Sequence, residues 1–216
     1  MEQQKFIPAL RFKWLTPLYD FFIWITMPEK KIKKALISEA NIYAGAKLLD
    51  FGCGTATLTI MAKQSSPEAK VTGIDVDREI LDKATKKIKK EKLDIFLLDY
   101  DGSQLPFQHN AFDRVISCLV FHHLDTDTKQ KALAEIFRVM NKDGQLLIAD
   151  FGRSRSWVQR TLFNIIRGLD GFNPTDANAK GLLPGMISGA GFENVVIKTR
   201  FKTMFGEVQI ISAQKI

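Results

Sequence analysis

The sequence predicts an α/β domain in which a parallel sheet carries helices on both faces. From residue 47 onward, short apolar segments of strand length alternate with longer segments of helical periodicity. Such alternation is typical of parallel strands connected by helices. The length of 216 residues and the apolar content of 45% suit a single compact domain with a sizeable core.

The N-terminal segment, residues 1–46, is expected to form a helical cover in front of a main domain of residues 47–216. Bulky apolar residues are frequent between Phe6 and Met27, but their longest uninterrupted run is Phe21 to Ile25. Such a run is too short to span a bilayer and makes a poor signal peptide. We therefore expect this segment to belong to the folded protein.

The first predicted strand opens the motif around which the main domain is organised. The strand Lys47 to Asp50 ends in a carboxylate, and Gly52 and Gly54 separate it from a predicted helix over Ala56 to Gln64. Glycine suits this turn because a tight turn and a close approach of ligand to backbone both exclude a Cβ. A second strand, Val71 to Asp75, ends in an acid about twenty residues later, where a carboxylate reaches a ribose hydroxyl pair. The unit predicts a nucleoside site.

Two residues narrow the identity of that nucleoside. A dinucleotide fingerprint needs a third glycine where Thr57 stands. Asp50 would repel a pyrophosphate at close range but attract a ligand with an ammonium and a sulfonium. S-adenosylmethionine carries both of these groups and a ribose, so it is favoured over the alternative of a nicotinamide cofactor and an oxidoreductase.

The remaining elements follow in order along the chain. Helices are expected over Asp77 to Lys90, from a cap at Thr126 or Thr128 through Met140, and over Leu182 to Ala190. Asn141 to Gly144 should end the second of these helices. Further strands are expected over Asp94 to Asp99, Asp113 to Leu119, Gln145 to Asp150, Val195 to Arg200 and Val208 to Ala213.

Several segments together resemble class I S-adenosylmethionine-dependent methyltransferases. They are Asp50-Phe51-Gly52-Cys53-Gly54-Thr55 with Asp75, Asp101 to Phe107 before Phe112-Asp113, Phe121-His122-His123-Leu124, and Gly144 to Asp150. Within the class, the chain most resembles the branch of ubiquinone/menaquinone C-methyltransferases and other small-molecule enzymes. The resemblance implies a Rossmann-like, doubly wound sheet of seven strands, mostly parallel, whose last strand runs antiparallel between the fifth and sixth.

The resemblance also implies a cofactor site for S-adenosylmethionine and its product S-adenosylhomocysteine. Tyr19-Asp20 resembles a pair that precedes the first strand and helps to close over the cofactor. Asp101 is favoured over Asp99 as the acid that accepts from the adenine amino group, because of its spacing to Leu105-Pro106-Phe107. The implied cofactor-binding residues are Tyr19, Asp50, Gly52, Cys53, Gly54, Thr55, Asp75, Val76, Asp101, Gly102, Cys118 and Leu119.

Methyl transfer itself demands little of the protein's side chains. The sulfonium cofactor brings the reactive carbon, so the protein mainly supplies alignment and a dry site. A base is needed only where the acceptor must lose a proton, as with a phenol or the ring carbon of a quinol. The candidates for that base are His122, Tyr19 and Asp20, whereas His123 is more typical of a structural hydrogen bonder.

Charge and composition limit the other partners. The lysines behind the net charge of +7 cluster mainly at 30–34 and 83–92, and those at 83–92 lie opposite an apolar helical stripe, which favours a solvated face over a nucleic-acid surface. Ser117-Cys118-Leu119-Val120 stands where base-amine enzymes carry an Asn-Pro-Pro-Tyr type signature, so a macromolecular acceptor, RNA or protein, is the weaker alternative. No Cys/His cluster has metal-ligand spacing, and the two cysteines suit a reduced, cytoplasmic protein.

The acceptor is expected to be a small, substantially apolar molecule such as a quinol or a lipid-like compound. The N-terminal segment and a helical stripe over Arg153 to Leu169 would cover it, although that stripe also fits an ordinary amphipathic helix. Arginines in the stripe could rest on an anionic membrane, so a peripheral membrane contact is left open. The sequence gives no indication of the oligomeric state.

Overall fold

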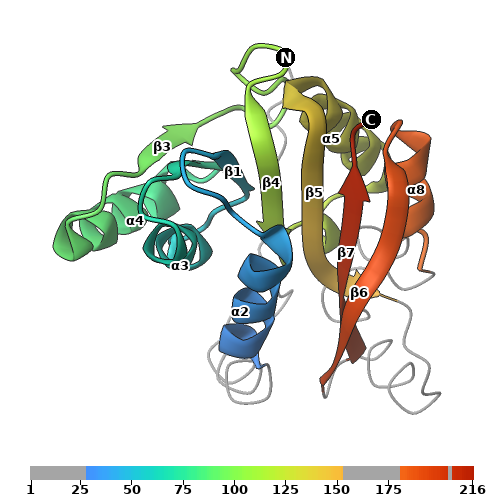
Figure 1. Ribbon diagram of the computed structural model, residues 1–216, viewed down its shortest axis with the longest axis horizontal. Helices are drawn as coiled ribbons and strands as arrows, with labels where there is room; N and C mark the ends of the chain where they lie inside the picture. The colour runs from blue at the N-terminus through green and yellow to red at the C-terminus, as the bar shows by residue number, and fades with distance from the viewer. Residues whose placement is uncertain (1–27, 153–180, 204–205) are drawn as a thin grey trace.

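The computed structural model describes residues 28–152, 181–203 and 206–216. They form a seven-stranded sheet in the order β3-β2-β1-β4-β5-β7-β6 (Figure 1). Strands β1 to β5 run parallel to one another, whereas β7 is antiparallel to both β5 and β6. The predicted sheet and its antiparallel last strand are confirmed. The strands are β1 (Lys47–Phe51), β2 (Lys70–Asp75), β3 (Phe96–Asp99), β4 (Phe112–Cys118), β5 (Met140–Gly152), β6 (Glu193–Thr203) and β7 (Gly206–Gln214).

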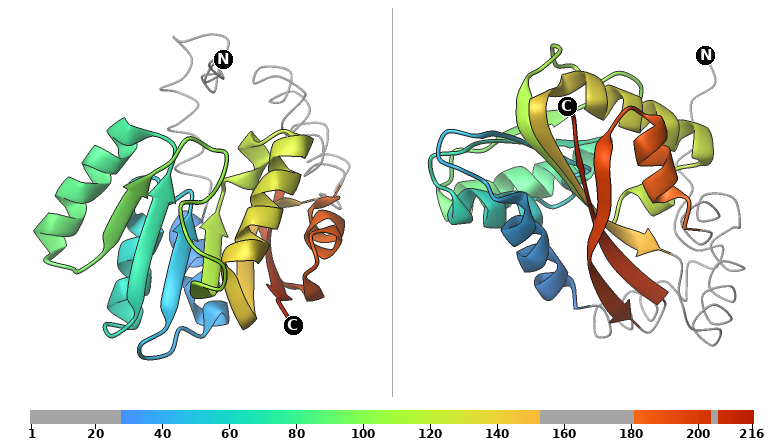
Figure 2. Two further views of the ribbon diagram at one scale, coloured as in Figure 1. Left: turned by 90° about the horizontal axis from the view of Figure 1, so that it is seen from above. Right: turned by 45° about the vertical axis from the view of Figure 1, so that its right-hand side comes forward.

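Helices cover both faces of this sheet (Figure 2). Side chains of α5 and α8 share one buried cluster with the sheet, and side chains of α2 and α3 share another. A smaller cluster joins α3 to α4. The helices are α2 (Glu29–Ala40), α3 (Thr57–Ser65), α4 (Arg78–Glu91), α5 (Thr126–Val139) and α8 (Leu183–Gly189), with a 3₁₀ turn, η1 (Phe121–His123).

The two-residue period of a strand explains why the central strands are apolar at successive positions. On β1, Leu49 packs with the α5–α8 cluster while its neighbour Leu48 packs with the α2–α3 cluster. On β4, Val115 and Ile116 divide in the same way. Because successive side chains point to opposite faces, a strand covered on both sides must be apolar at every position.

Several element boundaries differ from the sequence prediction, and three of the differences have a clear physical reason. The α5 cap is Asp125, whose carboxylate accepts from the Thr128 N–H at 2.7 Å, so the predicted cap at Thr126 or Thr128 is wrong. The predicted start of the fifth strand at Gln145 is also wrong, because α5 ends at Val139 and β5 begins at Met140, which pairs with Phe112 of β4 ahead of a bulge. Strand β3 begins at Phe96 rather than Asp94, since pairing with β2 starts there.

Two predicted features lie outside the described residues. They are the segment 1–27, with Tyr19 and Asp20, and the stripe Arg153 to Leu169. Helix α2 belongs to the predicted N-terminal cover, and its buried residues pack with β1, β4, β5 and β7. The division of the chain at residue 46 stays a prediction. Within the described ranges, no helix is both long and apolar enough to cross a membrane.

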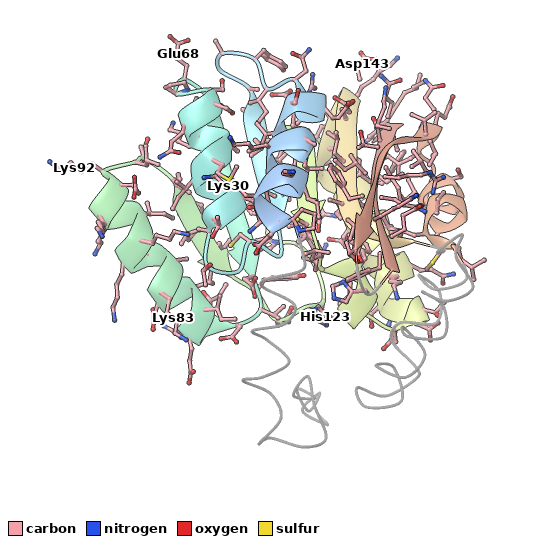
Figure 3. The ribbon with its side chains drawn as sticks, turned by 90° about the horizontal axis from the view of Figure 1, so that it is seen from below. Lys30, Glu68, Lys83, Lys92, His123 and Asp143 are labelled. Atoms are coloured by element: carbon pink, nitrogen blue, oxygen red, sulfur yellow. The ribbon has the colours of Figure 1, made fainter. Side chains whose placement is uncertain are left out.

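The carboxyl ends of the parallel strands gather the predicted site residues at one edge of the sheet. Strand order reverses between β1 and β4, and ligands of open α/β sheets bind in the crevice at such a switch point. Figure 3 shows His123 at this edge, with Glu68 and Asp143 at the opposite edge. The fold therefore brings the loops after β1, β2, β3 and β4 to one place.

The cap of α4 provides a test of the fold. The Asp77 side chain accepts from the N–H groups of Glu79 and Ile80, so Asp77→Ala should lower the free energy of unfolding by about 1 kcal/mol. The control is Asp82→Ala, which removes an exposed carboxylate from the middle of the same helix and should change stability little. Urea unfolding measures both, and equal stabilities for the two variants would contradict the assigned cap.

Candidate active site

The turn after β1 needs glycine for two different reasons. Gly52 has a φ of +73°, and a Cβ there would lie 2.4 Å from the Val120 Cγ2 in the loop after β4. Gly54 has a φ of +52°, yet no atom of the described residues lies within 4 Å of its Cβ position. The first glycine thus lets two loops touch at the switch point, whereas the second presents bare backbone to open space.

Asp75, the last residue of β2, holds this turn in place. Its Oδ2 accepts from the Gly54 N–H at 2.8 Å, and its Oδ1 accepts from the Asp77 N–H at 3.1 Å. The N–H groups of Gly52 and Cys53 both donate to the Ile74 carbonyl at 2.9 Å. A carboxylate offers about four lone-pair positions, so Asp75 can fix the turn and still accept from ligand hydroxyls.

Asp50 is a buried carboxyl beneath the same turn. It is 1% exposed, and the Thr59 Oγ1 donates to its Oδ2 at 2.6 Å. Burial raises the pKa of Asp50 from 3.8 to about 7, although Thr59 and the ammonium of Lys33 on α2 act in the opposite direction. A cation placed beside this carboxyl would stabilise its ionised form.

Lys33 was not predicted as part of the site. It lies in the lysine cluster at 30–34, but its side chain is only 13% exposed. It pairs with Glu29 one helical turn earlier and interacts electrostatically with Asp50 and Lys87. Its position three residues before the buried Leu36, on the inner side of α2, was the available signal.

The loops after β2 and β3 provide an apolar surface beside an anchored carboxylate. Val76 is 58% exposed, and its Cγ1 lies 3.6 Å from the Cβ position of Gly102. The Asp101 Oδ1 accepts from both the N–H and the hydroxyl of Ser103, and these hydrogen bonds lower the pKa of Asp101. Burial raises the pKa of Tyr100, which the sequence did not single out, to about 12. The arrangement suits a flat ring that carries an amino group.

The other predicted cofactor residues occupy the same edge in different ways. Both cysteines are free, and burial raises the pKa of each thiol, that of Cys118 to about 12. The Cys53 Sγ lies 3.0 Å from the Cβ position of Gly73 on β2, so this side chain fills space between strands. Thr55 is exposed just before α3, and Leu119 donates its N–H to the Ala149 carbonyl at 2.8 Å.

His122 is paired with a buried carboxylate. Its Nδ1 lies 3.0 Å from the Asp150 Oδ1, and its backbone N–H donates to the Asp150 Oδ2 at 3.3 Å. Burial alone would raise the pKa of Asp150, but the charge of His122 and the N–H groups of Phe151 and His122 hold it below its ordinary value. An ionised carboxylate can only accept, so the proton of the neutral imidazole is on Nδ1. The Nε2 is then the basic atom.

Asp150 is a functional candidate that the sequence prediction did not name. The sequence signal for it is weak, because it consists only of an acid near the carboxyl end of an apolar strand. Partial burial and the adjacent His122 lower the pKa of His123 to about 4, so this ring is neutral near pH 7. The rings of His122 and His123 are 3.9 Å apart between centroids.

The described residues fit an adenosyl ligand with an amino acid side arm. Gly54 leaves open space, Asp75 stands beside it, and the buried Asp50 lacks a full counter-charge. Tyr19 and Asp20 lie outside the described residues, so the structure gives no information on their roles. In the part of the chain that the structure describes, no group of three or more His, Cys, Asp or Glu side chains could hold a metal ion.

The raised pKa of Asp50 predicts an unusual pH dependence of stability. Because the native carboxyl keeps its proton up to about pH 7, its contribution to stability is full below about pH 4 and is lost as the pH rises through about 7. Asp50→Asn, which is isosteric and uncharged, should therefore gain stability relative to the natural protein between pH 5 and 8, by on the order of 2 kcal/mol. Urea unfolding at several pH values measures the difference, and a constant difference would contradict the raised pKa.

Comparisons with known proteins place these features in a family. Residues 48–144 match the methyltransferase domain family. The chain is 30% identical over 198 residues to demethylmenaquinone methyltransferase of Lactobacillus johnsonii, covering 82% of this chain and 80% of that protein. It is 32% identical over 132 residues to the ubiquinone/menaquinone biosynthesis C-methyltransferase of Bdellovibrio bacteriovorus, covering 61% and 55%.

Solved structures agree on the fold. A SAM-dependent methyltransferase from Aquifex aeolicus superposes with a TM-score of 0.65 at 18% identity, covering 90% of this chain and 97% of that one. The YcgJ protein from Bacillus subtilis gives a TM-score of 0.71 at 16% identity, covering 86% and 98%. These comparisons do not support an oxidoreductase or a macromolecular acceptor. The chain belongs to the class I S-adenosylmethionine-dependent methyltransferases, in the branch of the ubiquinone/menaquinone C-methyltransferases.

Proposed function

We propose that this methyltransferase acts on a small, substantially apolar acceptor of the quinol type. The observation that carries the proposal is the His122–Asp150 pair, which lies at the same edge of the sheet as the glycine turn. A phenolic or quinol acceptor must lose a proton during C- or O-methylation, and this pair supplies a base. The names of the matched relatives, which are menaquinone and ubiquinone methyltransferases, support the same acceptor class.

The residues of the glycine turn are proposed to bind the cofactor. S-adenosylmethionine, when bound, supplies an electrophilic methyl group on its sulfonium. Asp50 would hold the ammonium of the amino acid arm, Asp75 the ribose hydroxyls and Asp101 the adenine amino group. The ammonium of Lys33 is close enough to Asp50 to interact with it, and would attract the cofactor's carboxylate.

His122 is proposed to take the acceptor's proton. Its Nδ1–H is held by Asp150, so the Nε2 is directed away from that carboxylate and can accept from a hydroxyl. Asp150 would then stabilise the imidazolium, as a buried carboxylate does beside other catalytic histidines. The edge of the Phe151 ring against His122, at 5.1 Å between centroids, limits rotation of the imidazole.

The cofactor assignment predicts a specific loss of affinity in Asp75→Ala. Removal of a charged hydrogen-bond acceptor should cost about 1.5 to 3 kcal/mol, roughly tenfold or more in affinity for S-adenosylhomocysteine. The matched control is Asp99→Ala, at the position paired with Asp75 on the neighbouring strand, where the side chain is exposed. Calorimetry on both variants is the measurement. Equal affinities in the two would overturn the role given to Asp75.

The base assignment predicts a loss of rate without a loss of cofactor. His122→Gln should lower the rate of methyl transfer by about 10²-fold or more and leave cofactor affinity nearly unchanged. His123→Gln is the control, because His123 occupies the same turn without the bond to Asp150. Single-turnover kinetics with labelled cofactor measure the step. An unaltered rate in His122→Gln would reduce this residue to a structural role.

A peripheral contact with a membrane is part of the proposal, because a quinol with a lipid tail resides there. Figure 3 shows Lys30 on α2, Lys83 on α4 and Lys92 at the C-cap of α4, and these helices cover the same face of the sheet as α3. Such a surface would be attracted to anionic lipid at low salt. The exposed lysines of the two helices and the α4 cap are Lys30, Lys31, Lys34, Lys83, Lys86, Lys89, Lys90 and Lys92.

Two measurements test the acceptor class and the membrane contact separately. The protein should methylate members of a quinol panel and leave polar metabolites and lipid amines unmodified, as shown by mass spectrometry after incubation with labelled cofactor. Exclusive turnover of a polar acceptor such as a free amino acid would overturn the acceptor class. Sedimentation with anionic vesicles at low salt, but not with neutral vesicles, is the result expected for the membrane contact. Absence of vesicle binding would contradict that part alone.

A further inference from the structure

Three polar side chains form a cluster on β7 and β6, beside the end of β5. Glu207 and Gln209 of β7 are only 5% and 4% exposed, whereas the side chain of Arg200 on β6 is 32% exposed. The Arg200 Nη1 and the Gln209 Nε2 both donate to one oxygen, the Glu207 Oε1, at 2.5 and 2.9 Å. These three residues are called the β7 cluster below.

The β7 cluster lies against the strand that carries Asp150. Gln209 pairs with Asp150, and Glu207 pairs with Gly152, where β5 and β7 run side by side (Figure 1). Directly paired side chains of antiparallel strands share a face of the sheet, about 4.5–5.5 Å apart between Cβ atoms. A Cβ on Gly152 would lie 2.2 Å from the Gln209 Cδ, so this glycine lets the amide lie against the β5 backbone. The cluster therefore borders the His122–Asp150 pair.

Two buried oxygens of the β7 cluster accept no hydrogen bond from the protein. Because the Glu207 Oε1 takes both of the bonds, no group within residues 28–152, 181–203 and 206–216 donates to the Glu207 Oε2 or the Gln209 Oε1. The amide orientation follows from its partner, because a carboxylate accepts and only the Nε2 can donate to it. Buried acceptors are nearly always satisfied, so these two oxygens call for a further donor. A hydroxyl group provides one.

We propose that the β7 cluster binds a second hydroxyl of the methyl acceptor, at the Glu207 Oε2 and the Gln209 Oε1, while the first lies at His122. The proposed cofactor acids Asp50 and Asp75 belong to β1 and β2, whereas β7 lies on the other side of β4, beyond β5. The cluster thus adjoins the base on the side away from those acids. Aromatic acceptors with two hydroxyls are then selected over simple phenols. The inference rests on the proposed function.

A comparison of two ligands tests the inference without turnover. Naphthalene-1,4-diol, kept reduced under anaerobic conditions, carries two hydroxyls, and 1-naphthol lacks one of them. In calorimetry with the full chain and S-adenosylhomocysteine, the natural protein should bind the diol about tenfold more tightly, because the naphthol leaves the buried oxygens without a donor. Gln209→Met, which is similar in size but has no amide, should lose most of this preference by weakening the binding of the diol alone.

Two further variants control for the fold and for the position of the amide. Gly152→Ala places a Cβ against the Gln209 amide and should reduce the preference for the diol while the amide itself is kept. Gln145→Met is the matched control, because Gln145 is a glutamine near the start of β5 that donates to the Ser212 hydroxyl on β7 at 3.0 Å. This variant should keep the full preference. Thermal unfolding of each variant establishes that folded protein is compared.

The outcomes distinguish this inference from the proposed function. Loss of the preference in Gln209→Met, with the preference kept in Gln145→Met, supports the inference. An unaltered preference in folded Gln209→Met, or an equal loss of affinity for the two ligands, would overturn it. The β7 cluster would then be a structural ion pair that holds at most an ordered water, and the proposed acceptor class would stand. If the natural protein binds neither ligand, the inference and the acceptor class both fail.

Discussion

The hydrogen bond from the Gly54 N–H to the Asp75 carboxylate is the interaction on which the rest of the site depends. It joins the turn after β1 to the end of β2, and the contact between Gly52 and Val120 joins the same turn to the loop after β4. The three loops meet where the strand order reverses. The packed sheet and the helices on its two faces hold those strand ends in register, so the turn is positioned by the whole core rather than by its own short sequence.

The two buried carboxyls of the site differ in how their charge is compensated. Asp150 receives hydrogen bonds and positive charge from its own surroundings, so its pKa is lowered despite complete burial. Burial prevails at Asp50 over the hydrogen bonds from Thr59 and the charge of Lys33, so its pKa rises to about 7. In the proposed function, a cationic ligand compensates the charge of Asp50, whereas Asp150 is already paired with His122. One carboxyl would thus serve binding and the other proton transfer.

The sequence predicted the features whose signals are local. The alternation of apolar segments, the glycines after a strand and the acid at the end of β2 are each readable within a few residues, and the resulting sheet is the observed one. The residues that were missed act through contacts between distant segments. Asp150 lies 28 residues from His122, and Lys33 of helix α2 interacts electrostatically with Asp50 of strand β1. The early start of β5 was missed for the same reason, because pairing with Phe112 overrides the polar character of Asn141 to Gly144.

The most direct measurement of the central claim is a crystal structure of the full chain with S-adenosylhomocysteine. The account predicts the ribose hydroxyls at the Asp75 carboxylate, the adenine between Val76 and Gly102 with its amino group at Asp101, and the ammonium within hydrogen-bond distance of Asp50. Well-defined density for the ligand at another edge of the sheet, or at this edge with Asp50 and Asp75 out of contact, would contradict it.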